Sequence, residues 1–281
     1  MASSFHLKRS KWSSCCKLHS ADEEDAEPFH RADSLRQRRP GLHFILGQAR
    51  AASASRSCQT LGVAITSMRI YHLTSERWAL ESLRLQRLKL ALLEDMNDPF
   101  ELLGVELRTR EDRQFFQREL RPEMNRTVGV LCFSRTWDNP VLWSHYADKH
   151  RGLCLGFDVP DDLVCEVTYR RTRLSPDLEH AIPRHDKDTL PYKLMTTKYK
   201  HWEYEDEVRL IFNLEHVQLE DKRYFVPYCE ALTLKEVIIG PHCELTSNDV
   251  REKLMPEEAG ASVLRSRLAF RSYRVVRDRS A

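Results

Sequence analysis

The sequence has no long hydrophobic run. No stretch approaches the roughly 18–20 apolar residues that a helix needs to cross a bilayer, because charged residues recur throughout the chain. The N-terminus also lacks the apolar core of a signal peptide, since Lys8, Arg9, Lys11 and Lys17 interrupt it. We therefore expect a cytoplasmic protein with no membrane partner.

Glycine is scarce, with 9 residues in a chain of 281. Neither GxGxxG nor a GKT or GKS sequence occurs, which argues against P-loop enzymes and dinucleotide-binding Rossmann folds. The GxSxG sequence of serine hydrolases is missing as well. The 8 cysteines form no CxxC pair, so we expect free thiols in a reducing compartment. His145, His150 and Cys154 lack the partners of a tetrahedral metal site, and no metal is expected.

Positive charge is in small excess and unevenly placed. The formal net charge of +2 gives no chain-wide reason to bind nucleic acid or membranes. Residues 1–67 carry 10 Lys and Arg against 6 Asp and Glu, a net of +4, whereas residues 68–281 carry 34 against 36, a net of −2. The first segment is rich in Ser, Arg and Ala and has little apolar periodicity, so it is predicted to be a low-complexity, mostly disordered extension.

The sequence from Met68 onward begins like a domain, and we expect residues 68–281 to form one domain. One hypothesis is that translation starts at Met68 and not at Met1. Apolar, β-branched stretches predict strands over residues 69–73, 88–93, 127–134, 152–159, 163–169, 207–212, 223–228, 234–240, 262–270 and 272–277.

Fewer segments have helical character, and they lie at residues 74–84, 111–120, 139–150, 190–202 and 247–256. We expect Pro140 to start the third of these and Gly152 to stop it, and Ser247 or Asn248 to cap the last. Short links join most strands, and the helices cluster between early ones. This arrangement predicts an α+β fold with mixed or antiparallel sheets in place of repeating βαβ units.

The stretch HWEYEDEVRLIF, from His201 to Phe212, has acids at alternate positions ahead of an apolar strand. On an extended chain Glu203, Glu205 and Glu207 would point to the same side. Because aromatic residues alternate with them, we interpret that side as the wall of a cleft. The alternative is an ordinary solvated strand face.

Two more polar residues occupy notable strand positions: His72 on the first predicted strand and Ser134 at the end of the strand over 127–134. With the sequence Glu205-Asp206-Glu207-Val208, they resemble the ADP-ribosyltransferase superfamily, whose pattern is a His or Arg, a Ser or Tyr, and a Glu on successive strands. The resemblance implies a split β-sandwich, NAD as the substrate, an acceptor macromolecule, and NAD binding by His72 and Ser134. Taken singly, a strand His and a strand-ending Ser also have ordinary structural explanations.

Cleavage of the nicotinamide–ribose bond explains why such a site needs these residue types. Positive charge develops on the ribose, and a carboxylate in a dry pocket stabilises it. In this interpretation Glu207 takes that role, and Glu205 orients or deprotonates the acceptor. Trp143 or Tyr146 would stack on the nicotinamide ring.

Four longer blocks resemble an uncharacterised bacterial family, catalogued as domain of unknown function 2971, over residues 68–276. They are MNDPFE, CFSRTWDNPVLWSHYADKHRGLCLGFD, KYKHWEYEDEVRLI and LKEVIIGP. The positions that match the family motifs are Asn97, Asp98, Glu101, Ser134, Trp143, Tyr146, Gly152, Lys198, Trp202, Glu205 and Arg209. The family blocks centre on W-x-Y-E-x-E-x-R, which makes Glu205 an alternative to Glu207 as the key acid.

The same motif residues also have structural explanations. Asp98 and Glu101 would cap the backbone after a turn, Trp143 would fill the core, and Arg209 would pair with Glu207 on its own strand.

Three functions stay open on the sequence alone. The first is an NAD-consuming transferase or glycohydrolase, acting in stress or phage response, whose ligand is NAD or another nucleotide-like molecule. The second is a non-catalytic binding module whose acidic and aromatic face meets a basic partner. The third is a metal-dependent nuclease that uses Asp98 or Glu101 with Glu205, Glu207 and Lys198, although the usual Asp…Glu-x-Lys order is absent.

Overall fold

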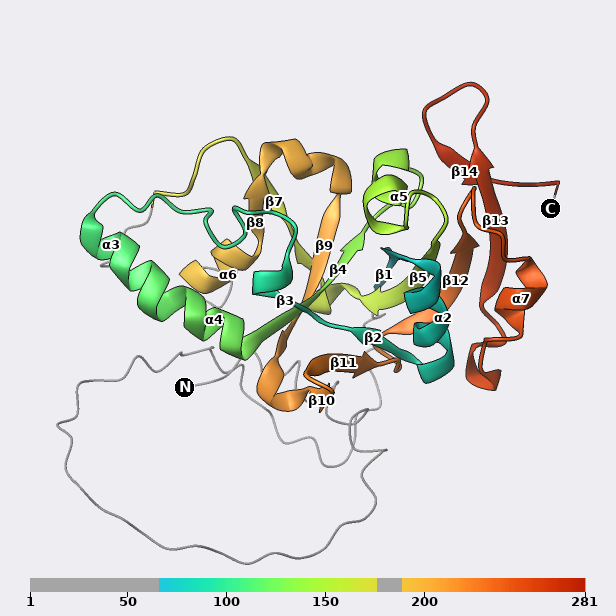
Figure 1. Cartoon of the computed structure of the whole chain (residues 1–281), viewed down its shortest axis with the longest axis horizontal. Helices are drawn as coiled ribbons and strands as arrows, with labels where there is room; N and C mark the ends of the chain where they lie inside the picture. The colour runs from blue at the N-terminus through green and yellow to red at the C-terminus, as the bar shows by residue number, and fades with distance from the viewer. Residues whose placement is uncertain (1–65, 176–188, 281) are drawn as a thin grey trace, which may run out of the picture.

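The computed structural model describes residues 66–175 and 189–280. Residues 1–65 of the predicted extension lie outside these ranges, whereas Ser67 already belongs to the first strand. Within them the chain forms the predicted α+β structure of mixed and antiparallel sheets with helices (Figure 1). No helix in the described ranges is long and apolar enough to cross a membrane.

Most strands lie where the sequence predicts them. The strands are β1 (Ser67–Thr74), β2 (Arg87–Lys89), β3 (Ala91–Leu92), β4 (Val128–Ser134), β5 (Leu153–Pro160), β6 (Cys165–Glu166), β7 (Thr168–Arg170), β8 (Thr197–Tyr199), β9 (Glu207–Asn213), β10 (Gln218–Glu220), β11 (Arg223–Pro227), β12 (Thr233–Ile239), β13 (Ser262–Leu268) and β14 (Val275–Arg277). The helices are α2 (Glu76–Leu85), α3 (Arg110–Phe115), α4 (Arg121–Thr127), α5 (Pro140–Tyr146), α6 (Leu190–Met195) and α7 (Ser247–Arg251).

Nine strands form the main sheet, in the order β14-β13-β12-β5-β1-β4-β9-β6, with β3 attached to β4. Neighbours are antiparallel except for β12 and β13, which run parallel. Two small sheets, β10-β11-β2 and the parallel pair β7-β8, flank it. The sheet therefore has no repeating βαβ pattern, in agreement with the prediction.

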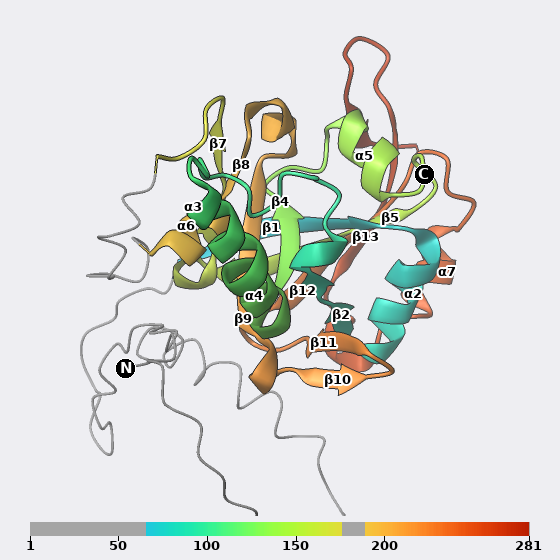
Figure 2. The same cartoon turned by 60° about the vertical axis from the view of Figure 1, so that its left-hand side comes forward.

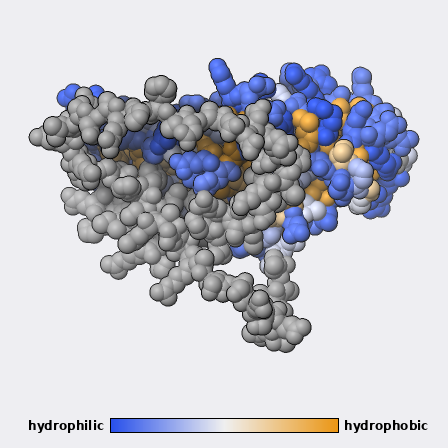
Figure 3. Space-filling model, turned by 90° about the horizontal axis from the view of Figure 1, so that it is seen from below, coloured by the Kyte–Doolittle hydropathy of each residue, from blue (hydrophilic) through white to orange (hydrophobic). Residues whose placement is uncertain are grey.

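The central strands bury both of their faces, and β9 is buried along nearly its whole length. On one face the larger core packs Phe133, Leu155 and Leu210 against Ala79 and Leu83 of α2. On the other face a second core is made by β4, β9, α6 and the helical segment of α3 and α4, which lies across these strands (Figure 2). Seen from below, the part of the described surface that is not covered in grey is largely hydrophilic with a smaller apolar area (Figure 3).

The helix predicted over 111–120 is longer than expected. It begins at Arg110, after a capping box between Thr109 and Asp112, and continues through α4 to Thr127. A π-helical turn over Phe116–Leu120 precedes Pro122. Because proline lacks an N–H and its ring crowds the carbonyl four residues back, a widened turn allows the helix to pass it.

Three other local predictions need correction. The helix predicted over 190–202 ends at Met195 and is followed by β8, whose residues pair with β7. The strand predicted over 163–169 is divided into β6 and β7, which pair with different partners. The side chain that caps α7 belongs to Thr246, which accepts from the Asp249 N–H, and not to Ser247 or Asn248.

Gly152 does not stop α5 by adopting a left-handed conformation. The helix ends at Tyr146, and the positive φ values fall on Asp148, Lys149 and His150. Glycine is required at 152 because a Cβ there would lie 2.1 Å from the carbonyl oxygen of Thr74. The constraint is a close approach of two backbone segments.

We expect Gly152→Ala to lower the free energy of unfolding by about 3 kcal/mol, because the backbone that a Cβ would meet cannot rotate away. The control is Gly260→Ala, where an added Cβ meets nothing within 4 Å; its effect should stay within about 0.5 kcal/mol. Urea unfolding of both variants measures the difference. Equal effects would contradict the close-approach explanation.

Candidate functional site

A pocket of about 260 Å³ opens where β1, β4 and β9 lie side by side. Tyr71 pairs with Ser134, and Ser134 pairs with Glu207, so these three side chains point to the same face of the sheet. The polar side chains that line this pocket include Tyr71, His72, Asn97, Ser134, Tyr146, Lys198, Glu205 and Glu207. The pocket therefore gathers most of the polar residues that the sequence singles out.

Behind the pocket wall lies Arg209, whose side chain is fully buried. Its guanidinium donates to both carboxylate oxygens of Glu101, at 2.5 and 3.1 Å, and to both oxygens of Glu207, at 2.7 and 3.2 Å. It also donates to the carbonyl of Met195 at 2.7 Å. The structural explanation of Arg209 as the partner of Glu207 is thus confirmed, and Glu101 is its second carboxylate instead of a backbone cap.

Lys198 extends this network to the pocket. Its ammonium donates to Glu205 and, at 3.1 Å, to Glu207, and it lies 4.9 Å from the centre of the Trp202 ring. Lys198 and both carboxylates are buried. One cation therefore joins the two acids. Lys198 lines the pocket, and Trp202 packs against its ammonium.

Tyr146 and Asn97 complete the network on the pocket side. The Tyr146 hydroxyl donates to Oε1 of Glu205 and accepts from Nδ2 of Asn97 at 2.7 Å. Asn139, the cap of α5, also donates to the backbone carbonyl of Tyr204 at 2.9 Å. The start of α5 is therefore tied to the same turn that carries Glu205.

The network holds three carboxylates and two cations, a formal excess of one negative charge in a buried region. Burial would raise the pKa of Glu207, but the charges of Arg209 and Lys198 outweigh it and hold that pKa at about 2. For Glu205 burial prevails over the attraction of Lys198, and its pKa is raised. Burial would lower the pKa of Lys198, but the two acids raise it. Glu205 is accordingly the carboxylate of the pair that takes up a proton more readily.

The sequence predicted that Glu203, Glu205 and Glu207 alternate along an extended strand, and this prediction is wrong. Residues Lys200–Glu205 form a 3₁₀ helix, and Asp206 has a left-handed conformation with φ 43°. Glu203 consequently points outward and pairs with Lys200, its side chain 56% exposed. The turn brings Glu205 and Glu207 to the same ammonium, whereas an extended chain would have placed all three acids on one side.

His72 borders the same pocket as Ser134 and Glu207, but it reaches this pocket from the other face of the sheet. Along β1 and β5 it alternates onto the face of Ile70 and Leu155, and its ring packs edge-on against Phe133 at 5.6 Å. In the described ranges Tyr71 and Ser134 form the single residue pair between β1 and β4. The His72 Nδ1 lies 3.0 Å from the carbonyl oxygen of Cys132. Because a carbonyl only accepts, Nδ1 carries the proton; burial lowers the pKa of His72, so the ring is neutral.

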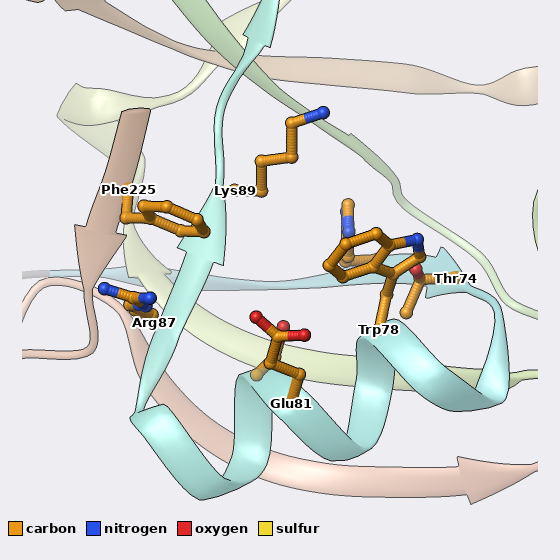
Figure 4. A pocket seen from close by; sticks show the side chains of 8 residues that line it. Thr74, Trp78, Glu81, Arg87, Lys89 and Phe225 are labelled. Carbon is orange, nitrogen blue, oxygen red and sulfur yellow. The ribbon is translucent and has the colours of Figure 1, made fainter. Parts of the chain in front are cut away.

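His72 borders both the first pocket and a second one of about 220 Å³ on the α2 face. Figure 4 shows this second pocket between Trp78 and Phe225, with Lys89 and Glu81 reaching toward it from opposite sides. The first pocket therefore brings His72 together with Ser134 and Glu207, and the role of His72 in holding NAD stays a prediction.

Trp143 is also unavailable to a ligand. It is fully buried, its indole N–H donates to the carbonyl of Trp137 at 2.6 Å, and it packs with Ala147, Cys154 and Ile238. The core explanation of Trp143 is confirmed, and stacking on nicotinamide by this residue is excluded.

The remaining motif residues have clear positions. Asp98 accepts from the backbone N–H of Phe100 at 2.9 Å, the capping role foreseen for it. Ser134 accepts from the N–H of Thr136 at 3.2 Å, which leaves its own hydroxyl proton free to donate. In the described ranges no cluster of three or more His, Cys, Asp or Glu is placed to hold a metal ion.

Two contributors to the site were missed. Tyr71 lines the pocket. Because side chains alternate along a strand, the residue next to His72 could have been expected on the opposite face of the sheet. Tyr169 accepts from the backbone N–H of Glu207 at 2.7 Å. Nothing in the sequence links residues 38 positions apart in this way.

These features define an α+β protein in which a buried charge network borders a small pocket. A family model described as "Protein of unknown function (DUF2971)" matches residues 142–210, so the chain is similar to that family over this segment. The matched segment supplies Tyr146, Lys198, Glu205, Glu207 and Arg209. No curated protein and no solved structure matches the chain.

We expect Arg209→Met to lower the free energy of unfolding by about 3–5 kcal/mol, because two buried carboxylates lose their main cation. The control is Arg126→Met, whose exposed guanidinium pairs with the half-buried Glu123; its cost should be far smaller, because solvent screens this pair. Chemical denaturation of the two variants gives the comparison. A small cost at Arg209 would show that water or rearrangement replaces the guanidinium.

Glu207 should make stability depend on pH in acid. Its folded pKa of about 2 lies below the ordinary value of 4.5, so the unfolded chain takes up the proton first as pH falls. The stabilisation is complete above pH 4.5 and is lost between pH 4.5 and about 2. Glu205, whose pKa is raised, has the opposite sign: its contribution is present at low pH and is lost as pH rises through its folded pKa.

We therefore expect the stability deficit of Glu207→Gln relative to the unsubstituted protein to shrink as pH falls through that window. Urea midpoints at a series of pH values measure it, with Glu123→Gln as control. A deficit that stays constant down to the lowest pH would disprove the assignment.

Proposed function

We propose that the pocket cleaves the bond between nicotinamide and ribose in NAD, as a glycohydrolase or as an ADP-ribosyltransferase-like transferase. The observation that carries the proposal is the unbalanced negative charge held at Glu205 on the pocket wall. The transition state of this cleavage carries positive charge on the ribose, as in glycoside hydrolysis. A preorganised buried carboxylate stabilises such charge more than it stabilises the neutral ground state of the ring.

Glu205 is a better candidate for this role than Glu207. Both oxygens of Glu207 are engaged by Arg209, and one also by Lys198. Glu205 has one bond at each oxygen, from Lys198 and Tyr146, and keeps a lone pair on each for a ribose hydroxyl. In this proposal Glu207 positions Lys198, and Glu205 contacts the substrate.

The size of the pocket limits what it would hold. About 260 Å³ is below the roughly 300–1,000 Å³ of common ligand pockets. It would therefore take the reacting end of a dinucleotide, with the remainder lying outside. The Ser134 hydroxyl is placed to donate to a group bound there.

A second candidate function is ligand binding without turnover. The hydrogen bonds from Lys198 and Tyr146 hold Glu205 in a fixed geometry, and one uncompensated negative charge is sufficient to attract a cationic group. An acceptor macromolecule is part of the transferase proposal, whereas a part in stress or phage response is compatible with either function.

The decisive experiment is nicotinamide release from NAD by the full chain, measured by chromatography. We expect Glu205→Gln to reduce the rate by about 100-fold or more. Its fold should persist, because glutamine has the size and shape of glutamate and Lys198 keeps Glu207 as a partner. Glu203→Gln, on the same turn but exposed, is the matched control and should keep full activity.

Absence of release by the unsubstituted protein, together with an unchanged melting temperature in NAD, would overturn the NAD proposal. A melting shift with NAD that is lost in Glu205→Gln, without any release, would favour binding alone.

A further inference from the structure

The hairpin of β13 and β14 projects from the body of the protein, and its loop is visible as a separate protrusion in two views (Figures 1 and 2). Leu268 pairs with Val275, and the N–H of Ala269 donates to the Arg274 carbonyl at 2.9 Å. These bonds close the loop, so its tip consists of the four residues from Phe270 to Tyr273. The side chains at the tip are therefore presented on a short, backbone-bonded support.

Two aromatic rings at this tip are almost completely in solvent. Phe270 is 89% exposed and Tyr273 is 97% exposed, whereas the next most exposed large hydrophobic residue in the described part of the chain, Leu219, is 58% exposed. Single exposed apolar residues are common on proteins, but two rings on one projecting loop form a contact surface. Neither ring contributes to a core in this position.

The same hairpin concentrates positive charge. Residues 265–279 contain 6 arginines and one acid, a net of +5, although residues 68–281 as a whole have a net of −2. Arg265 is used internally, since it donates to the carbonyls of Leu245 and Cys243. Arg271, Arg277 and Arg279 are exposed and form no ion pair with any carboxylate in the described ranges.

The remaining two arginines connect the charge to the rings and to the body. The Arg267 guanidinium lies 4.6 Å from the centre of the Phe270 ring. Arg274 pairs with Asp138 at 3.0 Å, and the Val275 N–H donates to the Asp138 carbonyl at 2.8 Å. The base of the hairpin is thereby attached to the segment that joins β4 to α5.

We propose that this hairpin binds single-stranded nucleic acid, with bases stacked on Phe270 and Tyr273 and phosphates paired with the free arginines. Aromatic rings together with a basic surface are the common means of holding a single strand, since every base has a flat face. Arginine suits this use because its planar fork pairs with phosphate and also stacks.

The geometry favours a single strand over a duplex and over a membrane. Paired bases in a duplex are already stacked, so they offer no face to an isolated ring on a loop. An anionic membrane would also attract the arginines, but interfacial binding relies on a broad apolar face, and the apolar contact here is limited to two rings. The proposal concerns binding alone and does not depend on NAD cleavage.

The test is fluorescence anisotropy of the full chain with labelled single-stranded RNA and DNA of about 15 nucleotides, a matched duplex, and anionic lipid vesicles. We expect the double variant Phe270→Ala/Tyr273→Ala to bind single strands at least about tenfold more weakly. Tyr199→Ala, which removes an exposed ring elsewhere, should change affinity less than about twofold. Arg277→Gln should lower the slope of log K against log salt concentration by about one.

All substituted side chains are exposed, so melting temperatures should be unchanged and lost binding cannot be ascribed to unfolding. The charged segment over residues 1–67 is identical in every protein compared, so the differences isolate the hairpin. The proposal is overturned if the double variant binds as tightly as the unsubstituted protein, if duplex is bound equally and without dependence on the rings, or if only vesicles are bound.

Discussion

The fully buried guanidinium of Arg209 is the interaction on which the site depends. A buried charge is tolerated only when its hydrogen-bonding capacity is satisfied, and here Glu101, Glu207 and the Met195 carbonyl supply the acceptors. These partners come from the turn after β3, from β9 itself and from the end of α6. One side chain thereby fixes three segments, and the wall of the pocket is part of what it fixes.

The unequal count of acids and bases in this network separates two carboxylates that look alike in the sequence. Glu207 is neutralised from both sides, by Arg209 and Lys198, and its pKa is low. Glu205 shares Lys198, accepts from Tyr146, and has a raised pKa. Two carboxylates two residues apart thus have different surroundings, although both border the pocket.

The sheet also divides the molecule into two faces with different contents. The charge network lies on the face covered by α3, α4 and α6, whereas His72 lies on the face covered by α2 and borders the pocket from there. The arginine-rich hairpin stands apart from both, on edge strands of the sheet. Substitutions of the exposed hairpin residues should leave the buried charge network intact, because these side chains take no part in the core.

Much of the fold was predictable from local patterns. The strands β4, β5, β9, β11 and β12 and the helices α2 and α5 follow from apolar runs, β-branched residues and caps that act within a few residues. The π-helical turn before Pro122, the 3₁₀ turn before Glu207 and the role of Gly152 were not predictable. The close approach at Gly152 and the placement of Glu205 beside Lys198 depend on which segments the fold brings together, and a widened turn is one of several ways in which a helix can pass a proline.

The sequence by itself determined the α+β class, most strand positions and the identity of the polar residues Tyr146, Lys198, Glu205, Glu207 and Arg209 as a set. Only the tertiary structure decided which of them face the pocket, that Trp143 is core, and that His72 borders the pocket from the other face of the sheet. The physical reason is that hydrophobic periodicity and capping are local properties, whereas pairing of buried charges, strand register and pKa depend on which segments the fold brings together.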